Sequence, residues 1–277
     1  MSDHPMKYPN EIPVGVDPTR ASIARVYDAA LNGKENYDVD REVLAQVRQV
    51  APQVNDLAWA NRNFLIRACR FLAIEAGIDQ FLDLGSGLPT AENTHQVVRR
   101  VNPEARVMYV DNDPVVLAHG RVLLTPGAGT DLVSADIFQP REVLEHPTIQ
   151  GFLDFDRPIG LLQVGTLHHY LPDDAGKVMA SYVEALAPGS FVVIGHFFDP
   201  QTEPHSDLAR KMEEEFIHSP MGSGRFRTRE QILEMFPGLE LVEPGLALCD
   251  DWWPDGPRLK ELNLVRQCIA GAVGRKP

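Results

Sequence analysis

The stretch Phe81–Thr90 reads FLDLGSGLPT, a short apolar run that ends at an acidic residue and continues into Gly-Ser-Gly. An apolar run of this length, followed by glycines and then a helix-like segment, indicates a buried strand, a tight turn and a helix. Glycine has no side chain, so the turn is expected to leave backbone N–H groups free and to let a ligand approach the chain closely. The stretch therefore predicts a ligand site at the end of a strand.

Further apolar runs follow this stretch, and helix-like segments separate them. Strands that alternate with helices are typical of a parallel sheet covered on both faces, and burial on both faces explains why these runs are almost entirely apolar. The pattern therefore predicts an α/β fold. We expect strands at residues 80–84, 106–110, 131–135, 159–164 and 190–196, and helices at 91–101, 114–124, 139–145 and 173–187.

The chain beyond residue 200 is less regular. Its pattern predicts a charged helix within 203–218, a loop at 219–227, a capped helix from 228 and a terminal strand in LVRQCIAGAVGRK. No internal repeat, low-complexity segment or clear linker interrupts the sequence. We therefore expect a single domain over residues 1–277, in which an N-terminal arm and helical lid (1–77) precede an α/β core (78–277).

The first quarter of the chain has the pattern of helices. Residues 1–18 carry four prolines and are expected to form an irregular arm. Thr19 is expected to cap a first helix that ends at Asn32-Gly33, and Asp38 is expected to cap a second. A third helix is expected from about residue 56 to the glycine at 77, because apolar residues recur there at helical spacing.

An acidic residue follows the second expected strand, which ends in MYVDND. The carboxylate of Asp111 would lie at the same edge of the sheet as the glycine turn, where it can accept hydrogen bonds from both hydroxyls of a ribose. The pair predicts a ligand that contains a nucleoside, and NAD enzymes share both features. The dinucleotide fingerprint requires a third glycine, but Thr90, preceded by Pro89, stands there. This difference favours a ligand without a pyrophosphate.

The series FLDLGSG, VMYVDNDP, SADIF, LLQVGTLHHYLPDD and LAPGSFVVIGHF resembles the motifs of class I S-adenosylmethionine-dependent methyltransferases between residues 80 and about 200. Nearly the whole chain resembles an actinobacterial family of S-adenosyl methyltransferases that was first known only as a domain of unknown function. ASIARVYDAALNGKENYDVDREV, FLDLGSGLPT and VGRKP carry that resemblance. The sequence departs from the family at 29–32, which read AALN in place of a Tyr-Leu-Leu-Gly type run.

The resemblance implies a Rossmann-like fold with a seven-stranded sheet, parallel except for one strand near the C-terminus, and helices on both faces. It implies S-adenosyl-L-methionine as the cofactor, bound across the carboxyl ends of the first strands. The implied contacts are Asp83 with the ammonium group, Gly85, Ser86 and Gly87 beneath the methionine part and ribose, Asp111 with the ribose hydroxyls, Asn112, Asp136 and Ile137 with the adenine, and Gln163 and Val164 on the floor near the sulfonium.

Methyl transfer to an alcohol or phenol requires alignment of the acceptor and removal of its proton. His168 and His169 follow the fourth expected strand and are candidate general bases, because imidazole titrates near neutral pH. The alternative is that one of them packs against the sheet or caps the next helix, and some methyltransferases use no base. His196, which ends the fifth strand, is a further candidate or else a hydrogen-bonded core histidine.

Other segments have two interpretations each. The stretch RVYDAALNGKENY is either a surface helix end or part of a lid over cofactor and acceptor. Asn61, Arg62 and Arg67 are expected to be solvated or interhelical polar groups. Trp252 and Trp253 either form a wall of an aromatic acceptor site or anchor an irregular loop to the core.

Composition restricts the class of partner. A net charge of −13 and a pI near 5.1 disfavour binding to nucleic acid, which requires clustered cations. The three cysteines and the histidine spacing suggest neither a disulfide framework nor a required metal. The sequence also lacks the pattern of a membrane span or signal peptide, so we expect a cytoplasmic protein.

The sequence thus predicts a methyltransferase acting on a small-molecule acceptor. It leaves open the acceptor, the atom methylated and the oligomeric state. Two rival functions are an NAD-dependent oxidoreductase and an accessory or regulatory protein that binds S-adenosylmethionine without turnover.

Overall fold

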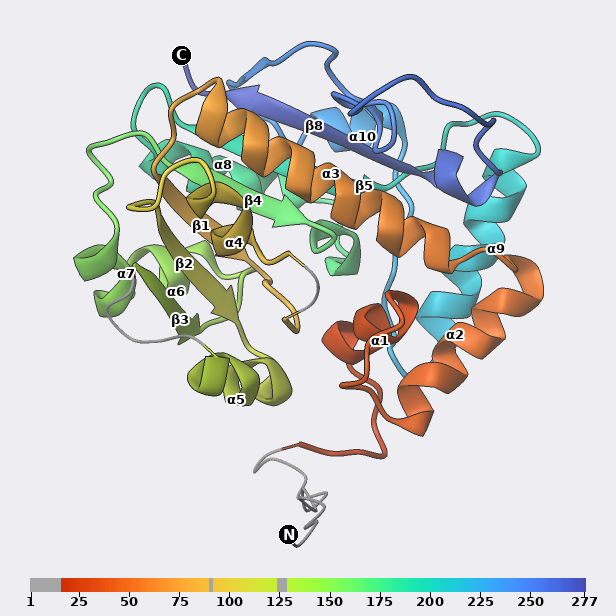
Figure 1. Ribbon diagram of the computed structural model, residues 1–277. Helices are drawn as coiled ribbons and strands as arrows, with labels where there is room; N and C mark the ends of the chain where they lie inside the picture. The colour runs from red at the N-terminus through yellow and green to blue at the C-terminus, as the bar shows by residue number, and fades with distance from the viewer. Residues whose placement is uncertain (1–15, 90–91, 124–128) are drawn as a thin grey trace, which may run out of the picture.

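The centre of the molecule is one mixed sheet. The computed structural model describes residues 16–89, 92–123 and 129–277. Its strands are β1 (Gln80–Leu84), β2 (Arg106–Asp111), β3 (Thr130–Ser134), β4 (Gly160–Val164), β5 (Phe191–Phe197), β6 (Glu240–Leu241), β7 (Ala247–Leu248) and β8 (Ile269–Arg275). They lie in the order β3-β2-β1-β4-β5-β8-β6, and β7 also pairs with β8 (Figure 1).

The five strands expected between residues 80 and 197 are all present, each within one residue of its expected bounds. These strands run parallel to one another. The chain places β2 and β3 on one side of β1, and β4 and β5 on the other. The winding therefore reverses between β1 and β4, and in α/β folds ligands bind at the carboxyl ends of the strands beside such a reversal.

The far edge of the sheet differs in strand number from the expectation. β8 runs antiparallel to β5, as expected for the terminal strand, while β6 and β7 both run antiparallel to β8 and hence in the direction of β5. Pro244 lies between β6 and β7, and proline has no N–H group for a strand ladder. The seventh strand is thus divided in two, which gives eight strands in the described part of the chain in place of seven.

Helices surround the sheet. The expected helices are present, and α7 was not expected because six residues are too few to show a helical period. The α-helices are α1 (Ile23–Ala30), α2 (Asp38–Val50), α3 (Asn55–Ile74), α4 (Thr94–Arg99), α5 (Pro114–Leu123), α6 (Pro140–Leu144), α7 (Pro147–Phe152), α8 (Ala175–Ala185), α9 (His205–His218) and α10 (Arg229–Leu233), with 3₁₀ turns η1 (Leu167–His169) and η2 (Val265–Cys268).

Two expected helix caps are wrong. Thr19 lies before the first helix, and the cap is Ser22, whose hydroxyl accepts a hydrogen bond from the backbone N–H of Arg25 at 3.3 Å. Asp38 is the first residue of α2 and Tyr37 occupies the cap position. Ser, Thr and Asp are all good caps, so the competing positions can be separated only by the path of the chain.

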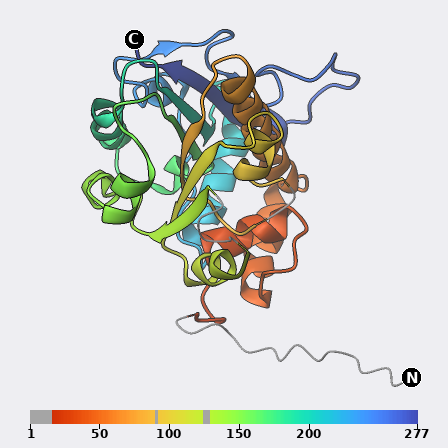
Figure 2. The same cartoon turned by 60° about the vertical axis from the view of Figure 1, so that its left-hand side comes forward.

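The two faces of the sheet carry different groups of helices. Buried residues of α1–α4 and α9 pack on one face, while those of α6, α7, α8 and α10 pack on the other. Figure 2 shows the sheet between these two layers, with the orange helix α3 on one side and the green helices on the other. Both faces of the central strands are therefore buried, as their continuous apolar sequence predicted.

α3 approaches the sheet closely because glycines lie beneath it. A Cβ atom added at Gly271 of β8 would lie 2.6 Å from the ring of Phe64, and one added at Gly195 of β5 would lie 2.7 Å from the Asn61 side-chain oxygen. Any larger residue would force α3 away from the sheet. The N-terminal half of α3 is thereby fixed at the carboxyl end of β4, where the chain reverses its winding.

α1 and α2 are joined by a buried ion pair. Nε of Arg25 lies 2.8 Å from Oδ2 of Asp40, and the two residues are 3% and 0% exposed. The Asp40 carboxylate also accepts hydrogen bonds from the backbone N–H groups of Ser22 (3.0 Å) and Tyr37 (2.8 Å). The guanidinium lies 5.0 Å from the centre of the Tyr37 ring. This carboxylate therefore fixes the start of both helices.

We expect Asp40→Ala to lower the free energy of unfolding by about 3–5 kcal/mol, because it leaves the Arg25 guanidinium buried without its counter-charge. Urea denaturation followed by circular dichroism measures the change. Asp38→Ala is the matched control, since its partner Arg41 and Asp38 itself are exposed and such pairs contribute at most about 1 kcal/mol. Equal losses in the two variants would contradict a structural role for the buried pair.

Candidate active site

A cavity of about 720 Å³ lies at the carboxyl ends of β1, β2 and β4, with α1 on its other side. Figure 1 shows α1 beyond these strand ends. The volume is in the range of small-molecule and cofactor sites. Among the residues predicted to bind the cofactor, those that line the cavity are Asp83, Gly85, Ser86, Gly87, Asp111, Asn112, Asp136, Ile137 and Val164.

Asp111 connects the two loops that form the floor of this cavity. Its Oδ2 accepts a hydrogen bond from the backbone N–H of Gly87 at 2.8 Å, and its Oδ1 accepts one from the N–H of Asp113 at 2.9 Å. Burial raises the pKa of the Asp111 carboxyl. Each carboxylate oxygen can accept two hydrogen bonds, so the carboxylate can still accept from two ribose hydroxyls.

The glycine turn differs from the expectation that its backbone N–H groups are free. The N–H groups of Gly85 and Ser86 donate to the Val110 carbonyl at 2.8 and 3.3 Å, and that of Gly87 donates to Asp111. The turn folds back on β2, so these donors are used within the protein. A pyrophosphate binds through such donors, so this arrangement favours a ligand without one. Thr90, the other sign against a dinucleotide, lies outside the described residues.

Gly85 also provides space for the ligand. Its φ is +74°, in the region where side chains are unfavourable, and an added Cβ would lie 2.4 Å from Cγ2 of Thr166. A side chain there would be strained and would enter the wall between β1 and β4. The residue is thus required by both the turn and the shape of the cavity.

Asp83 is almost completely buried at the end of β1. Oγ1 of Thr94 donates to its Oδ2 at 2.6 Å. Burial raises the pKa of this carboxyl to about 6, against the opposing effects of the Thr94 hydrogen bond and the Arg62 guanidinium, which also lines the cavity. A buried carboxylate with a raised pKa gains most from a bound cation. It is therefore suited to an ammonium group.

Gln163 alone among the predicted cofactor residues does not line the cavity. It is fully buried, and its Oε1 accepts a hydrogen bond from the hydroxyl of Thr166. Side chains of successive strand residues point to opposite faces, so Gln163 and Val164 cannot both face the site. Gln163 instead supports the turn that follows β4.

The adjacent histidines occupy different environments. His169 is partly buried and lines the cavity, and its Nδ1 lies 2.9 Å from Oγ of Ser223. His168 is buried and stacked on Phe197, with ring centres 3.6 Å apart and planes at 5°. His168 contributes instead to a second, apolar pocket. Burial lowers the pKa of His169 to about 3 and that of His168 well below its usual value, so both imidazoles are neutral near pH 7.

His196 is a hydrogen-bonded core histidine and not a base facing the cavity. Its Nδ1 lies 2.6 Å from the Phe197 carbonyl, and its Nε2 lies 3.0 Å from the guanidinium of Arg227. Arg227 is itself 2% exposed and donates to the carbonyls of Leu167, Tyr170 and Pro172. No sequence pattern singled out Arg227, yet its hydrogen bonds fix the turn that carries His168 and His169.

Three polar residues of α3 were expected to be solvated or interhelical, and all three are buried. The interhelical alternative is confirmed for Asn61, whose amide nitrogen donates to the Tyr27 hydroxyl of α1. Asn61 and Arg62 line the cavity. Arg67 donates to the carbonyls of Trp252 and Cys249 and thereby holds the C-terminal loop. Trp252 is fully buried with its ring 5.5 Å from that of Phe64, so it anchors this loop and does not line the cavity.

A hydrogen bond joins the N-terminal segment, for which a lid was one interpretation, to the loop after β2 that lines the cavity. The Ser22 hydroxyl donates to the carboxylate of Asp113, beside Asp111. Ser22 and its neighbours from residue 20 to 25 line the cavity. Asp28 and Asn36, in contrast, bond to each other and hold the turn after α1. The start of α1 and the residues just before it therefore form one wall of the cavity, while Asp28 and Asn36 stabilise the turn after the helix.

Some classes of site are absent from the part of the chain that the structure describes. Within residues 16–89, 92–123 and 129–277, no group of three His, Cys, Asp or Glu side chains is arranged to hold a metal ion. In the same ranges, no helix is both long enough and apolar enough to cross a membrane.

Comparison with known proteins agrees with this geometry. A family model described as S-adenosyl methyltransferase matches residues 9–277. A crystal structure of a candidate methyltransferase from Thermobifida fusca is 43% identical, with 95% of this chain and 97% of that chain covered and a TM-score of 0.87. A DUF574 family protein from Streptomyces avermitilis is 35% identical, with 94% and 99% covered and a TM-score of 0.87.

A more distant structure shares the fold alone. It is an O-methyltransferase family protein from Burkholderia thailandensis, 14% identical, with 86% of this chain and 59% of that chain covered and a TM-score of 0.50. The match over residues 9–277 and the two similar structures show that this chain belongs to the S-adenosyl methyltransferase family, whose cofactor is S-adenosyl-L-methionine.

Proposed function

We propose that this protein binds S-adenosylmethionine in the cavity at the ends of β1, β2 and β4 and methylates a small-molecule acceptor that enters beside α1. The observation that carries the proposal is that one cavity is lined by the glycine turn, the acidic residues Asp83 and Asp111, and His169. The cofactor supplies an activated methyl group on a sulfonium, so the protein has only to bind, align and exclude water.

The residues of the cavity fit this cofactor. Asp111 would hold the ribose hydroxyls, Asp83 the ammonium group, and Asp136 with Ile137 the adenine. The acidic side chains match a ligand that carries two cationic groups, and the inward-bonded amides of the glycine turn do not call for a phosphate. This chemistry favours adenosylmethionine over NAD.

On the acceptor side, we assign His169 to contact with the acceptor, whereas His168 forms part of a wall. A pKa of about 3 leaves the His169 imidazole neutral and only weakly basic near pH 7. Proton transfer is most efficient when the pKa of the base is near the working pH, so His169 is poorly suited to act as a general base. His169 would therefore orient the acceptor through a hydrogen bond. The N-terminal residues through α1 would act as a lid, and residues 1–277 as one functional domain.

A small molecule is the acceptor class that the charge of the chain supports. The net charge of −13 repels nucleic acid backbones, and the cavity is bordered by helices that enclose a ligand. A cytoplasmic location, where adenosylmethionine is made, is part of the same proposal.

Calorimetric titration of the purified protein with S-adenosylmethionine tests the proposal. We expect binding with a Kd on the order of micromolar, no heat with NAD, and binding weakened about tenfold or more in Asp111→Ala, because two hydrogen bonds to a charged acceptor are lost. Asp131→Ala is the control, since this carboxylate lies in β3 and does not line the cavity.

Binding of NAD in preference to adenosylmethionine would refute the proposal. Equal affinity in the wild type and Asp111→Ala would refute the assignment of Asp111. Tight binding with no cofactor consumption over a broad panel of acceptors would support the accessory-protein alternative.

The neutral state of the buried histidines predicts a pH dependence of stability. The unfolded chain takes up a proton on each histidine below a pH of about 6.5, whereas His169 and His196 in the folded protein stay neutral to a pH of about 3. The contribution of these two neutral histidines to the free energy of unfolding is thus present above about pH 6.5 and is lost as the pH falls. Asp83, with its raised pKa, acts in the opposite direction between about pH 6 and 4.

We therefore expect His169→Gln to reduce the dependence of the unfolding free energy on pH between about 6.5 and 5 by the equivalent of about one proton. Urea denaturation at several pH values measures the slope. His218→Gln, at an exposed position at the end of α9, is the control and should leave the slope unchanged. Parallel curves for the wild type and His169→Gln would show that His169 is not held neutral.

A further inference from the structure

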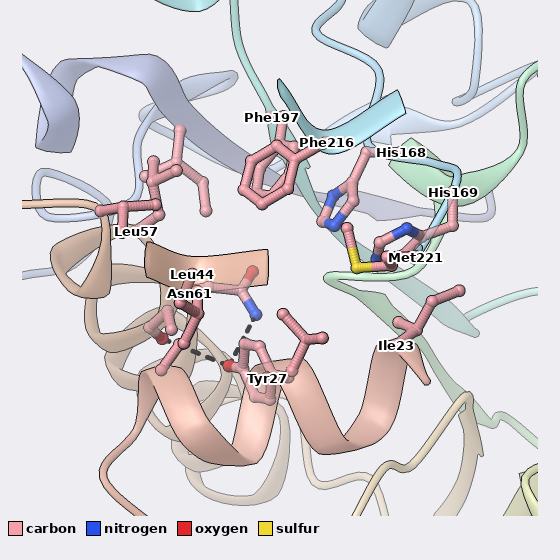
Figure 3. Close-up of a pocket in the computed structure, with 15 residues that line it drawn as sticks. Ile23, Tyr27, Leu44, Leu57, Asn61, His168, His169, Phe197, Phe216 and Met221 are labelled. Carbon is pink, nitrogen blue, oxygen red and sulfur yellow. Dashed lines mark hydrogen bonds between the residues drawn. The ribbon is translucent and has the colours of Figure 1, made fainter. Parts of the chain in front are cut away.

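A second pocket of about 50 Å³ opens beside the cofactor cavity, between α1, α3 and α9. Its walls are mainly aliphatic and aromatic (Figure 3). We propose that this pocket receives an uncharged apolar group of the methyl acceptor, and that the nucleophilic atom of the acceptor lies where the pocket meets the cofactor cavity. The inference rests on the proposed function and adds the chemical class of the acceptor.

The pocket and the cofactor cavity share a boundary of five described residues. Ile23, Tyr27, Asn61, His169 and Met221 line both the pocket and the cavity. A molecule placed at this boundary can therefore extend into the pocket on one side and reach the cofactor cavity on the other. None of the boundary residues comes from the glycine turn or from the loop that contains Asp111.

The pocket offers no counter-charge to an ionised group. Among the described residues that line it, none is Asp, Glu, Lys or Arg. The nearby guanidinium of Arg227 already bonds to three carbonyls and His196, and the two lining histidines are neutral. Burying a carboxylate without a partner costs several kcal/mol or more. Acceptors with a charge at this end are therefore excluded by the walls.

The walls also limit the shape of the group. Phe197 stacks between other rings, at 3.6 Å from His168, 5.5 Å from Phe216 and 4.8 Å from Phe226. These stacked rings make one side of the pocket rigid. A dry cavity of about 150 Å³ holds a benzene molecule, so a pocket of 50 Å³ takes a short alkyl group or the edge of a ring, and the rest of the acceptor lies in the larger cavity.

The polar atoms at the boundary indicate what the acceptor presents there. The Tyr27 hydroxyl donates its one proton to the Ala58 carbonyl at 3.2 Å, so at 3.1 Å it must accept from the amide nitrogen of Asn61. This fixes the orientation of the amide. Its oxygen is buried and has no hydrogen-bond partner among the described residues, which is costly for a protein alone. A hydroxyl or amine on the acceptor would supply the missing donor once the Asn61 side chain moves off Gly195 of β5, against which its oxygen packs.

A matched pair of probes tests whether the pocket excludes a charged group. 4-Ethylphenol and 4-hydroxybenzoate have the same ring and hydroxyl, but only the second carries a carboxylate at neutral pH. We expect ligand-observed NMR titrations, in saturating S-adenosylhomocysteine, to show 4-ethylphenol binding at least about tenfold more tightly. Tighter binding of 4-hydroxybenzoate, or binding of neither probe while S-adenosylhomocysteine binds, would overturn the proposal.

Filling the pocket tests its location. Ala58→Leu adds bulk at a lining position, and Ala73→Leu is the matched control, because both are buried alanines of α3 and only Ala58 lines the pocket. We expect Ala58→Leu to weaken 4-ethylphenol by about tenfold and to leave S-adenosylhomocysteine affinity within about twofold. An unchanged 4-ethylphenol affinity in folded Ala58→Leu would overturn the location.

A thermal melt of each variant checks folding, and Ala30→Val, on the α1 wall of the pocket, gives a milder filling if Ala58→Leu does not fold. Failure of the proposed function has a different signature. It would appear as absence of S-adenosylhomocysteine binding in the wild type, with 4-ethylphenol still bound and still sensitive to Ala58→Leu.

Discussion

The close contact of α3 with the glycines of β5 and β8 is the constraint on which the rest of the structure depends. It places Phe64 against Gly271 and Asn61 against Gly195, so the helix lies at the carboxyl end of the sheet at a fixed height. α1 is then positioned through the hydrogen bond between Tyr27 and Asn61, and the C-terminal loop through Arg67. The α1 wall of the active site and the anchoring of the C-terminal loop thus both depend on one helix-to-sheet distance, which only glycine permits.

The sequence predicted those features that depend on local pattern. Continuous apolar runs located the central strands because parallel strands are buried on both faces, and the glycine turn with Asp111 located the cavity because strand ends on one edge must meet. Features that depend on tertiary contacts could not be predicted from the sequence. Nothing local separates His168 from His169, since only the geometry of the η1 turn directs one ring to the cavity, and Arg227 shows its importance only once three carbonyls surround it.

The hydrogen bonds of the glycine turn also explain how a common strand-turn-helix unit can select its ligand. In a dinucleotide site the turn presents amides to a phosphate. Here Val110 and Asp111 accept from those amides, which removes them from the cavity, and the described lining then carries five aspartates against three arginines. The choice between an anionic and a cationic ligand is therefore made by the neighbouring strand, and the turn sequence alone cannot decide it.

The site has two parts with different physical chemistry. The larger cavity is acidic and is built on the strand ends that define the fold, whereas the smaller pocket is apolar and is built on α1, α3 and α9 together with the η1 turn and Met221. Changes in the pocket walls alter apolar volume and leave the carboxylates of the cavity in place. Among the described residues the two parts share five lining residues. We therefore propose that the acceptor and the cofactor are recognised almost independently, with Tyr27, Asn61 and His169 in contact with both.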